Sequence, residues 1–179
     1  MQIKDKEFTT FIGRAELDAT VERLAAEVNR DYRGRSLLVC PVLTGAFMFA
    51  TDLLRRLTVD CEVDFVRYTS YSGLSSTGVV SCSLPFPRQV AGRDVLIVED
   101  VVDSGLSMAH IREAALALAP RSLRICTLFF KPQAFKGDYA VDYVGREIGN
   151  EFIVGYGMDY DGAGRNLPEV MVVEDTGKR

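Results

Sequence analysis

The sequence has no tryptophan, a single histidine and only four cysteines in 179 residues. The four cysteines (Cys40, Cys61, Cys82, Cys126) are far apart and form no Cys-x-x-Cys motif, and three of the four lie in apolar, strand-like segments. Buried free thiols are the expected state of such cysteines. The one histidine, His110, lies in a helical pattern and is expected at the surface or in packing. We therefore expect a protein of the reducing cytoplasm.

Excess positive charge and long apolar runs are also missing. The 21 basic and 25 acidic residues give a net charge of -4 and an isoelectric point near 5.1. This balance argues against general nucleic-acid binding, which needs a basic surface. No apolar run approaches the roughly 20 residues of a membrane span, and MQIKDKEFTT lacks the apolar core of a signal peptide. We expect one globular domain that contacts neither membrane nor nucleic acid.

Segments with the apolar spacing of helices alternate along the chain with strand-like apolar runs, and this order predicts an α/β protein. Residues 14–32 repeat apolar side chains at the spacing of an amphipathic helix, whereas residues 36–43 form a continuous apolar run typical of a buried strand. Strands alternating with helices predict a parallel sheet with right-handed crossovers. The expected helices are residues 14–32, 47–57 and 104–119; the expected strands are 36–43, 61–68, a strand from 95, 123–130, 143–144, 152–154 and 170–173, with loops at 70–78 and 155–164.

Residues 95–108, VLIVEDVVDSGLSM, combine a buried strand with a turn of small residues and a helix start. Free backbone N–H groups at a helix start, with nearby hydroxyls, suit a phosphate monoester. The carboxylates of Glu99 and Asp100 suit the hydroxyls of a sugar. Ligands of parallel sheets bind at the carboxyl ends of the strands, and the Thr44–Gly45 turn falls at the same edge. The segment therefore predicts a site for a phosphorylated ribose.

This segment resembles the phosphoribosyl-diphosphate (PRPP) loop of the type I phosphoribosyltransferases. Four further segments are similar to those of the hypoxanthine-guanine members, in the family's order. They resemble, in turn, the pyrophosphate loop, the lid, the lysine that recognises the base, and the segment that stacks on the purine and reaches a metal (residues 41–53, 70–78, 129–132, and 151–160 with Arg165). The resemblance extends over most of the chain.

The resemblance implies a single domain over residues 1–179. Its fold would be the type I α/β fold, a parallel sheet with helices on both faces. The core would span about residues 35–135, and the N-terminal segment and residues 142–179 would form a small hood. The implied activity is purine salvage: transfer of 5-phosphoribosyl from PRPP to hypoxanthine or guanine, giving IMP or GMP and pyrophosphate, with Mg²⁺. A homo-oligomer, dimer or tetramer, is also expected.

The resemblance also implies roles for individual residues on the phosphate side. The 5′-phosphate would bind the backbone N–H groups and hydroxyls of the turn and helix start (Asp103, Ser104, Gly105, Leu106, Ser107). Glu99 and Asp100 would bind the ribose hydroxyls or water on the metal. Thr44, Gly45 and Arg165 would bind pyrophosphate. Thr44 stands where many members carry lysine, so backbone amides are expected to supply most contacts, and the peptide before it is expected to be cis.

On the purine side, Asp103 is the implied general base for N7. The Lys131 ammonium group, which can only donate hydrogen bonds, would select a 6-oxo group. Phe152 would stack on the purine, while main-chain groups of Ile153 and Asp159 would contact its edge. Asp159 would also reach Mg²⁺. Ser70 and Tyr71 would begin a lid that closes over the substrates and excludes water.

Three alternatives remain open from the sequence. The nearest is a phosphoribosyltransferase that prefers xanthine. A second is a regulator that keeps the fold to sense PRPP or nucleotides without catalysis, although the acidic charge balance disfavours one that acts on nucleic acid. The third, a bare phosphate-binding or receiver-like domain, leaves the segment of residues 151–160 unexplained.

Overall fold

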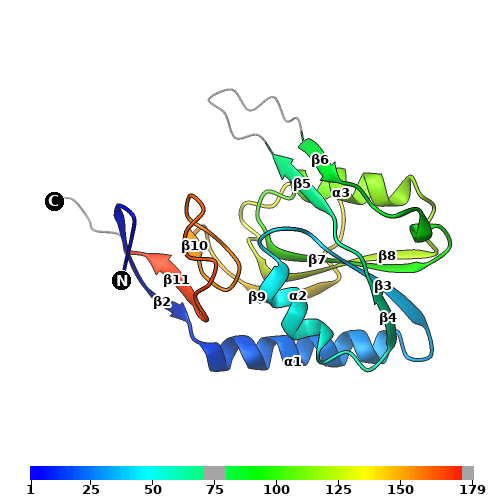
Figure 1. Ribbon diagram of the computed structural model, residues 1–179, viewed down its shortest axis with the longest axis horizontal. Helices are drawn as coiled ribbons and strands as arrows, with labels where there is room; N and C mark the ends of the chain where they lie inside the picture. The colour runs from blue at the N-terminus through cyan, green and yellow to red at the C-terminus, as the bar shows by residue number, and fades with distance from the viewer. Residues whose placement is uncertain (71–79, 175–179) are drawn as a thin grey trace.

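The computed structural model describes residues 1–70 and 80–174 and is built around a five-stranded sheet (Figure 1). All neighbouring strands in this sheet run parallel, which confirms the predicted α/β class. The central strands are apolar on both sides because both faces of the sheet are covered. The strand order is β4 (Asp60–Val63), β3 (Ser36–Pro41), β7 (Asp94–Val102), β8 (Ser122–Phe130) and β9 (Tyr143–Glu147).

Helices cover both faces of the sheet, as predicted. Alternate residues of β7 point to opposite faces of the sheet. Leu96 and Val98 pack in the cluster formed with α1 (Arg14–Asp31) and α2 (Phe47–Leu54). Its neighbours Val95 and Ile97 pack in the cluster formed with α3 (Leu106–Leu116). A short 3₁₀ helix, Arg88–Val90, precedes β7. In the part of the chain that the structure describes, no helix has the length and hydrophobicity to span a bilayer.

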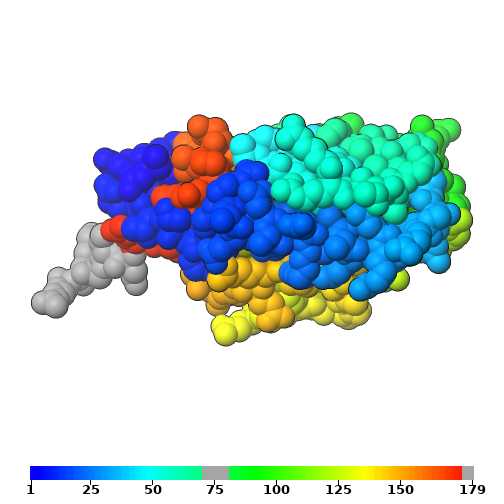
Figure 2. Space-filling model, turned by 90° about the horizontal axis from the view of Figure 1, so that it is seen from below, coloured from blue at the N-terminus to red at the C-terminus, as the bar shows by residue number. Residues whose placement is uncertain are grey.

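The two terminal segments meet in a second, antiparallel sheet of four strands. Its order is β1 (Gln2–Ile3), β2 (Lys6–Ile12), β11 (Val170–Val173) and β10 (Ile153–Val154). The N-terminal and C-terminal segments accordingly lie side by side at one end of the molecule, blue against orange and red in Figure 2. The sequence did not indicate β1 or β2. β2 buries only Phe8 and Ile12 and leaves most of its other side chains exposed, so its alternation is weak.

The strand predicted over residues 61–68 is wrong, because two separate strands occupy this region. β4 ends at Val63, and β5 (Arg67–Ser70) instead pairs with β6 (Val80–Leu84) in an antiparallel hairpin beyond the sheet (Figure 1). Val66 forms the last parallel bridge, to Val42, before the chain leaves. The apolar pattern of residues 61–68 therefore continues where the chain changes its partner strand from β3 to β6, and the pattern does not reveal this change. The loop expected at residues 70–78 lies almost wholly outside the described residues.

The helix predicted from Ser104 begins at Leu106. Gly105 precedes it with a φ of +78°, a left-handed conformation that the helix cannot include. Ser104 is therefore part of the turn and does not cap the helix. Similarly, β3 ends at Pro41 and not at Leu43, and α2 ends at Leu54 and not at Leu57.

Asp94 fixes the amino end of the central strand. Its side chain is fully buried, and it accepts hydrogen bonds from the Arg121 guanidinium (Nε at 3.0 Å) and the Ser122 hydroxyl at 2.6 Å. The hydrogen bond from Arg121 is the main cause of a lowered pKa for Asp94. The ionised carboxylate is thus the form that the fold stabilises.

Replacing Asp94 with asparagine should lower the free energy of unfolding at pH 7 by about 1–3 kcal/mol, because a hydrogen-bonded charge pair is lost. Since folding lowers the Asp94 pKa, its contribution is present above the unfolded value, about 3.9, and is lost as pH falls through the folded value. The difference between variant and wild type should therefore shrink in acid. Urea unfolding at several pH values measures this. Exposed Asp60, changed to asparagine, is the control, and equal losses in the two variants would contradict the prediction.

Candidate active site

The acidic pair of β7 lies inside the strand, not after it. β7 continues to Val102, and Asp103 follows directly. Glu99 and Asp100 are partly exposed near the carboxyl edge of the sheet. Burial of the Glu99 carboxyl group, followed by the charge of Asp100, raises the pKa of Glu99 well above its usual range. A donor or cation bound beside this pair would favour the ionised form.

The turn after β3 passes directly beside this acidic pair. The peptide between Leu43 and Thr44 is cis, and Thr44 is exposed. A side chain at Gly45 would collide with the Asp100 carboxylate, and one at Gly157 would collide with the Gly45 carbonyl. Three segments therefore meet at one point: the turn expected to bind pyrophosphate, the acids of β7, and residues 155–164, the Gly-rich loop.

Arg165 is held across the base of the Gly-rich loop. Its guanidinium donates to the Gly157 carbonyl at 2.8 Å and pairs with the Asp159 carboxylate at 2.6 Å. The other Asp159 oxygen accepts a hydrogen bond from the Gly162 N–H at 2.7 Å. Arg165 and Asp159 thus lie next to each other, and Gly157 connects them to Gly45.

A pocket of about 250 Å³ opens between the sheet edge and the segment that contains β10. Core residues form one wall and residues 151–159 the other, and the lining is Asp100, Val101, Asp103, Lys131, Glu151, Phe152, Ile153, Met158 and Asp159. Four residues predicted on the purine side (Lys131, Phe152, Ile153, Asp159) and the predicted base Asp103 therefore line the same cavity.

An ion pair joins the two polar core residues of this pocket. Lys131 Nζ lies 2.9 Å from Asp103 Oδ2. Lys131 follows β8 and is 9% exposed, whereas the Asp103 side chain is more than half exposed. The pocket thus presents a nearly buried cation and an accessible carboxylate next to each other.

Phe152 is exposed and is not part of the core, although aromatic residues in apolar segments are usually buried. The residue is 44% exposed, and its ring packs edge-on against Tyr160, with ring centroids 5.7 Å apart. Ile153 behind it is buried and pairs with Val172 in the second sheet. An aromatic surface is therefore available to a planar ligand in the pocket.

The turn expected to bind the 5′-phosphate, residues 103–105 and here called the phosphate turn, lies beside this pocket. Ser104 accepts a long hydrogen bond, 3.4 Å, from the Leu106 N–H through its hydroxyl, and Ser107 is partly buried in the first turn of α3. His110, also in α3, is exposed, and its ring forms a hydrogen bond with the Leu106 carbonyl at 2.8 Å. The turn thus lies at the carboxyl edge of the sheet, as the sequence predicted, but the helix begins two residues later than predicted, at Leu106.

Some expected site residues cannot be placed, and some lining residues were not expected. Ser70 ends β5, and Tyr71 lies outside the described residues. Three lining residues were not predicted from the sequence: Val101, Met158 and Glu151. The first two are apolar and carry no signal. Glu151 directly precedes Phe152 in a segment already singled out, and one of its oxygens is buried with no hydrogen-bond partner among the described residues.

Comparison with known proteins assigns the family. A model of the phosphoribosyl transferase domain matches residues 13–161. Hypoxanthine-guanine phosphoribosyltransferase of Mycobacterium bovis is 43% identical over 159 residues, covering 85% of this chain and 79% of the relative. Hypoxanthine phosphoribosyltransferase of Salmonella typhimurium is 41% identical over 162 residues, covering 89% and 91%.

A similar fold occurs among solved structures. The crystal structure of a hypoxanthine-guanine phosphoribosyltransferase from Bacillus anthracis superposes with a TM-score of 0.89 at 36% identity, covering 95% of this chain and 100% of the other. The matched residues 13–161 contain the parallel sheet, the phosphate turn and all the residues that line the pocket. The chain belongs to the phosphoribosyltransferase family.

Proposed function

We propose that the protein transfers the 5-phosphoribosyl group of PRPP to hypoxanthine or guanine, giving IMP or GMP and pyrophosphate. The observation that carries this proposal is the pocket in which Lys131, Asp103 and Phe152 meet beside the phosphate turn. Relatives that act as hypoxanthine or hypoxanthine-guanine phosphoribosyltransferases share about 40% of the sequence. Such an enzyme serves purine salvage.

The purine would lie between the two walls of the pocket. The exposed ring of Phe152 would stack on its face, with main-chain groups of Ile153 and Asp159 at its edge. The Lys131 ammonium group has three donors and already uses one on Asp103, so a further one is available for a 6-oxo group. Adenine carries an amino donor at this position and would be rejected.

Asp103 would act as the general base. As the purine N9 attacks C1′ of the ribose, the bond between C1′ and the pyrophosphate oxygen breaks and pyrophosphate leaves. The proton on N7 would pass to the accessible Asp103 carboxylate. Lys131 would hold that carboxylate in place through the 2.9 Å ion pair. The same ion pair would thus orient the general base Asp103 and place Lys131 to recognise the purine.

The phosphates would bind along the sheet edge. Backbone N–H groups of Asp103 to Ser107 would hold the 5′-phosphate at the start of α3, where the helix dipole favours an anion. Glu99 and Asp100 would accept hydrogen bonds from the ribose hydroxyls. Thr44, Gly45 and Arg165 would contact pyrophosphate, with Arg165 exchanging its bond to Asp159 for phosphate oxygens.

Mg²⁺ would be the cofactor, held by Asp159 and by the acidic pair of β7. The donor set fits, because Asp100 and Asp159 line the same pocket and the charge of Asp100 already opposes ionisation of Glu99. Across residues 1–70 and 80–174, no three carboxylate, histidine or cysteine side chains form a ready-made metal site. Substrate phosphates and water would therefore supply the other ligands, as is usual for Mg²⁺. When bound, the ion would neutralise charge on the leaving pyrophosphate.

The proposal includes three further points. Ser70 and Tyr71 would begin a lid over the substrates, since the β5–β6 hairpin is the structure that leads into them. The enzyme would form a homo-oligomer, either a dimer or a tetramer. It would act in the cytoplasm, where Cys40 and Cys126, buried on opposite faces of the sheet, would stay reduced.

Pyrophosphate release in the presence of PRPP and Mg²⁺ tests the proposed reaction. We expect turnover with hypoxanthine or guanine and none with adenine or orotate, because Lys131 selects a 6-oxopurine. Preferential turnover of xanthine would establish a different specificity on the same site. If PRPP binds and no base is turned over, the protein is a sensor and not an enzyme.

Changing Asp103 to asparagine tests the general base. The variant should lose about 10²–10⁴-fold in kcat, because the amide cannot accept the N7 proton. KM for PRPP should change much less, since the phosphate contacts come mainly from the backbone. Steady-state kinetics with both substrates measures the two effects. The control is exposed Asp60 changed to asparagine, and an unchanged kcat in the Asp103 variant would exclude it as the base.

A further inference from the structure

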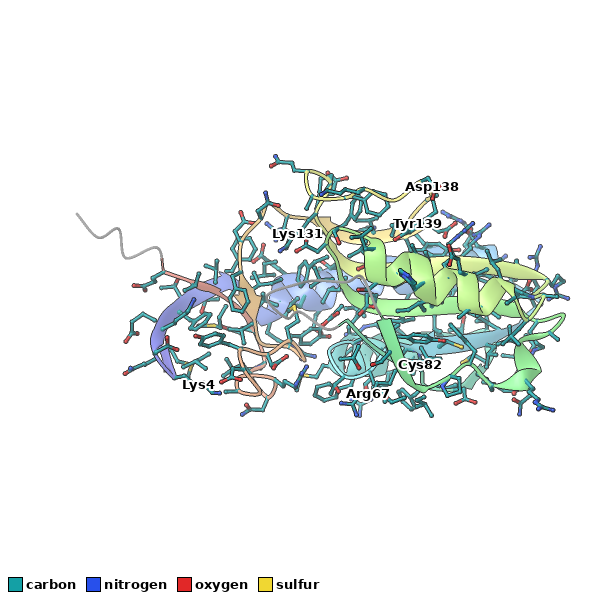
Figure 3. All side chains as sticks on the ribbon, turned by 90° about the horizontal axis from the view of Figure 1, so that it is seen from above. Lys4, Arg67, Cys82, Lys131, Asp138 and Tyr139 are labelled. Atoms are coloured by element: carbon teal, nitrogen blue, oxygen red, sulfur yellow. The ribbon has the colours of Figure 1, made fainter. Side chains whose placement is uncertain are left out.

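The segment between β8 and β9, residues 131–141, passes behind the phosphate turn; we call it the strap. Figure 3 labels three of its residues, Lys131 at its start and Asp138 and Tyr139 further along, with Tyr139 beside α3. The strap packs into the core cluster beneath α3 through Phe135, Tyr139 and Val141. It is therefore a packed part of the fold that touches both the purine pocket and the phosphate turn.

Two hydrogen bonds connect the strap to consecutive peptides of the turn. The Lys136 N–H donates to the Ser104 carbonyl at 3.0 Å. The Tyr139 hydroxyl donates to the Gly105 carbonyl at 2.6 Å. The Gly105 carbonyl also accepts the first bond of α3, from the Ala109 N–H at 2.9 Å. The Ser104 and Gly105 carbonyls thus each accept one hydrogen bond from the strap.

Peptide geometry gives these bonds a consequence for the ligand side. In a planar trans peptide, the carbonyl of one residue and the N–H of the next point in opposite directions. Holding the Ser104 carbonyl against the strap therefore directs the Gly105 N–H away from it. Holding the Gly105 carbonyl does the same for the Leu106 N–H, whose hydrogen bond to the Ser104 hydroxyl is long, 3.4 Å, and would be exchanged for one to a phosphate oxygen. These are two of the N–H groups that the proposed function assigns to the 5′-phosphate.

Packing fixes the Tyr139 hydroxyl in position. Gly105 leaves no space for a side chain, because the rings of Phe135 and Tyr139 lie against it. Those two rings pack edge to face at 5.3 Å, and the Arg112 guanidinium lies 5.7 Å from the Tyr139 ring centre. Burial raises the pKa of Tyr139 to about 12. The hydroxyl is therefore protonated at neutral pH and donates.

We propose that Tyr139 is a positioning residue for PRPP, which acts through the Gly105 carbonyl to aim the Leu106 N–H at the 5′-phosphate. This inference rests on the proposed function. The strap also begins at Lys131, which would face the purine, whereas the hydrogen bond of the Tyr139 hydroxyl goes to Gly105 in the phosphate turn. Loss of this hydroxyl therefore affects PRPP and leaves purine binding unchanged, a separation that general destabilisation does not produce.

Tyr139→Phe tests the inference, because it keeps the ring and removes the hydroxyl. KM for PRPP should rise about five- to tenfold, as expected for the loss of one hydrogen bond, with KM for hypoxanthine within about twofold of wild type. The dissociation constant for ribose 5-phosphate, measured by calorimetry, should rise by the same factor. This second measurement requires no turnover.

Tyr143→Phe is the matched control. Its hydroxyl is also bonded, to Asp31 at 2.9 Å and to Arg124 at 2.6 Å, on the other side of the sheet from α3. Loss of the Tyr143 hydroxyl should lower the unfolding temperature without changing KM for PRPP or KM for hypoxanthine. If Tyr139→Phe behaves like this control, with ribose 5-phosphate binding unchanged, the positioning role is wrong and the proposed function stands.

The remaining outcomes separate the two proposals. If the wild type binds ribose 5-phosphate, Tyr139→Phe weakens that binding and no purine is turned over, the positioning role is supported and the proposed reaction fails. If the wild type binds neither ribose 5-phosphate nor PRPP, both proposals are overturned.

Discussion

The close approach of Gly45 to Asp100 and Gly157 determines the geometry of the site. Neither glycine has room for a side chain at this contact, and Gly157 also has a φ of +104° that favours glycine. Next to Gly157, the buried Tyr156 donates its hydroxyl to Asp52 at 2.6 Å, and Arg14 donates to the same carboxylate at 2.9 Å. The Gly-rich loop is therefore bonded to α1 and α2 while its backbone rests on the sheet edge.

The parallel core was predictable from the sequence because its signal is physical and local. β3, β7 and β8 are buried on both faces, so their apolar runs are continuous, and each is followed by a turn of small residues or a proline. The β5–β6 hairpin and the N-terminal strands were not predictable in the same way. Their side chains are largely exposed or change partner within a continuous apolar pattern, so pairing depends on contacts distant in the sequence.

The site was predictable in its parts but not in all its contacts. The phosphate turn is recognisable because an acidic strand end, small residues and a helix start are contiguous. Lys131 and Phe152 were identified only through resemblance, since a lysine after a strand or an aromatic residue in an apolar segment has no specific signal. Tyr139 was missed entirely. Its role depends on a bond between residues 34 positions apart in the sequence, and no local pattern encodes this bond.

The two walls of the pocket come from different parts of the fold. Asp100, Asp103 and Lys131 belong to the core sheet and its turns, whereas residues 151–159 belong to a short segment attached to the second sheet. In the proposed function, the second stretch would supply the ring that stacks on the base and the contacts to its edge, whereas Lys131, the proposed selector of the 6-oxo group, lies on the first stretch with the phosphate turn. During divergence within a family, substitutions confined to residues 151–159 could therefore alter how a base is stacked and held, whereas a change of the accepted 6-substituent would require a change in the part of the chain that also carries out phosphoribosyl transfer.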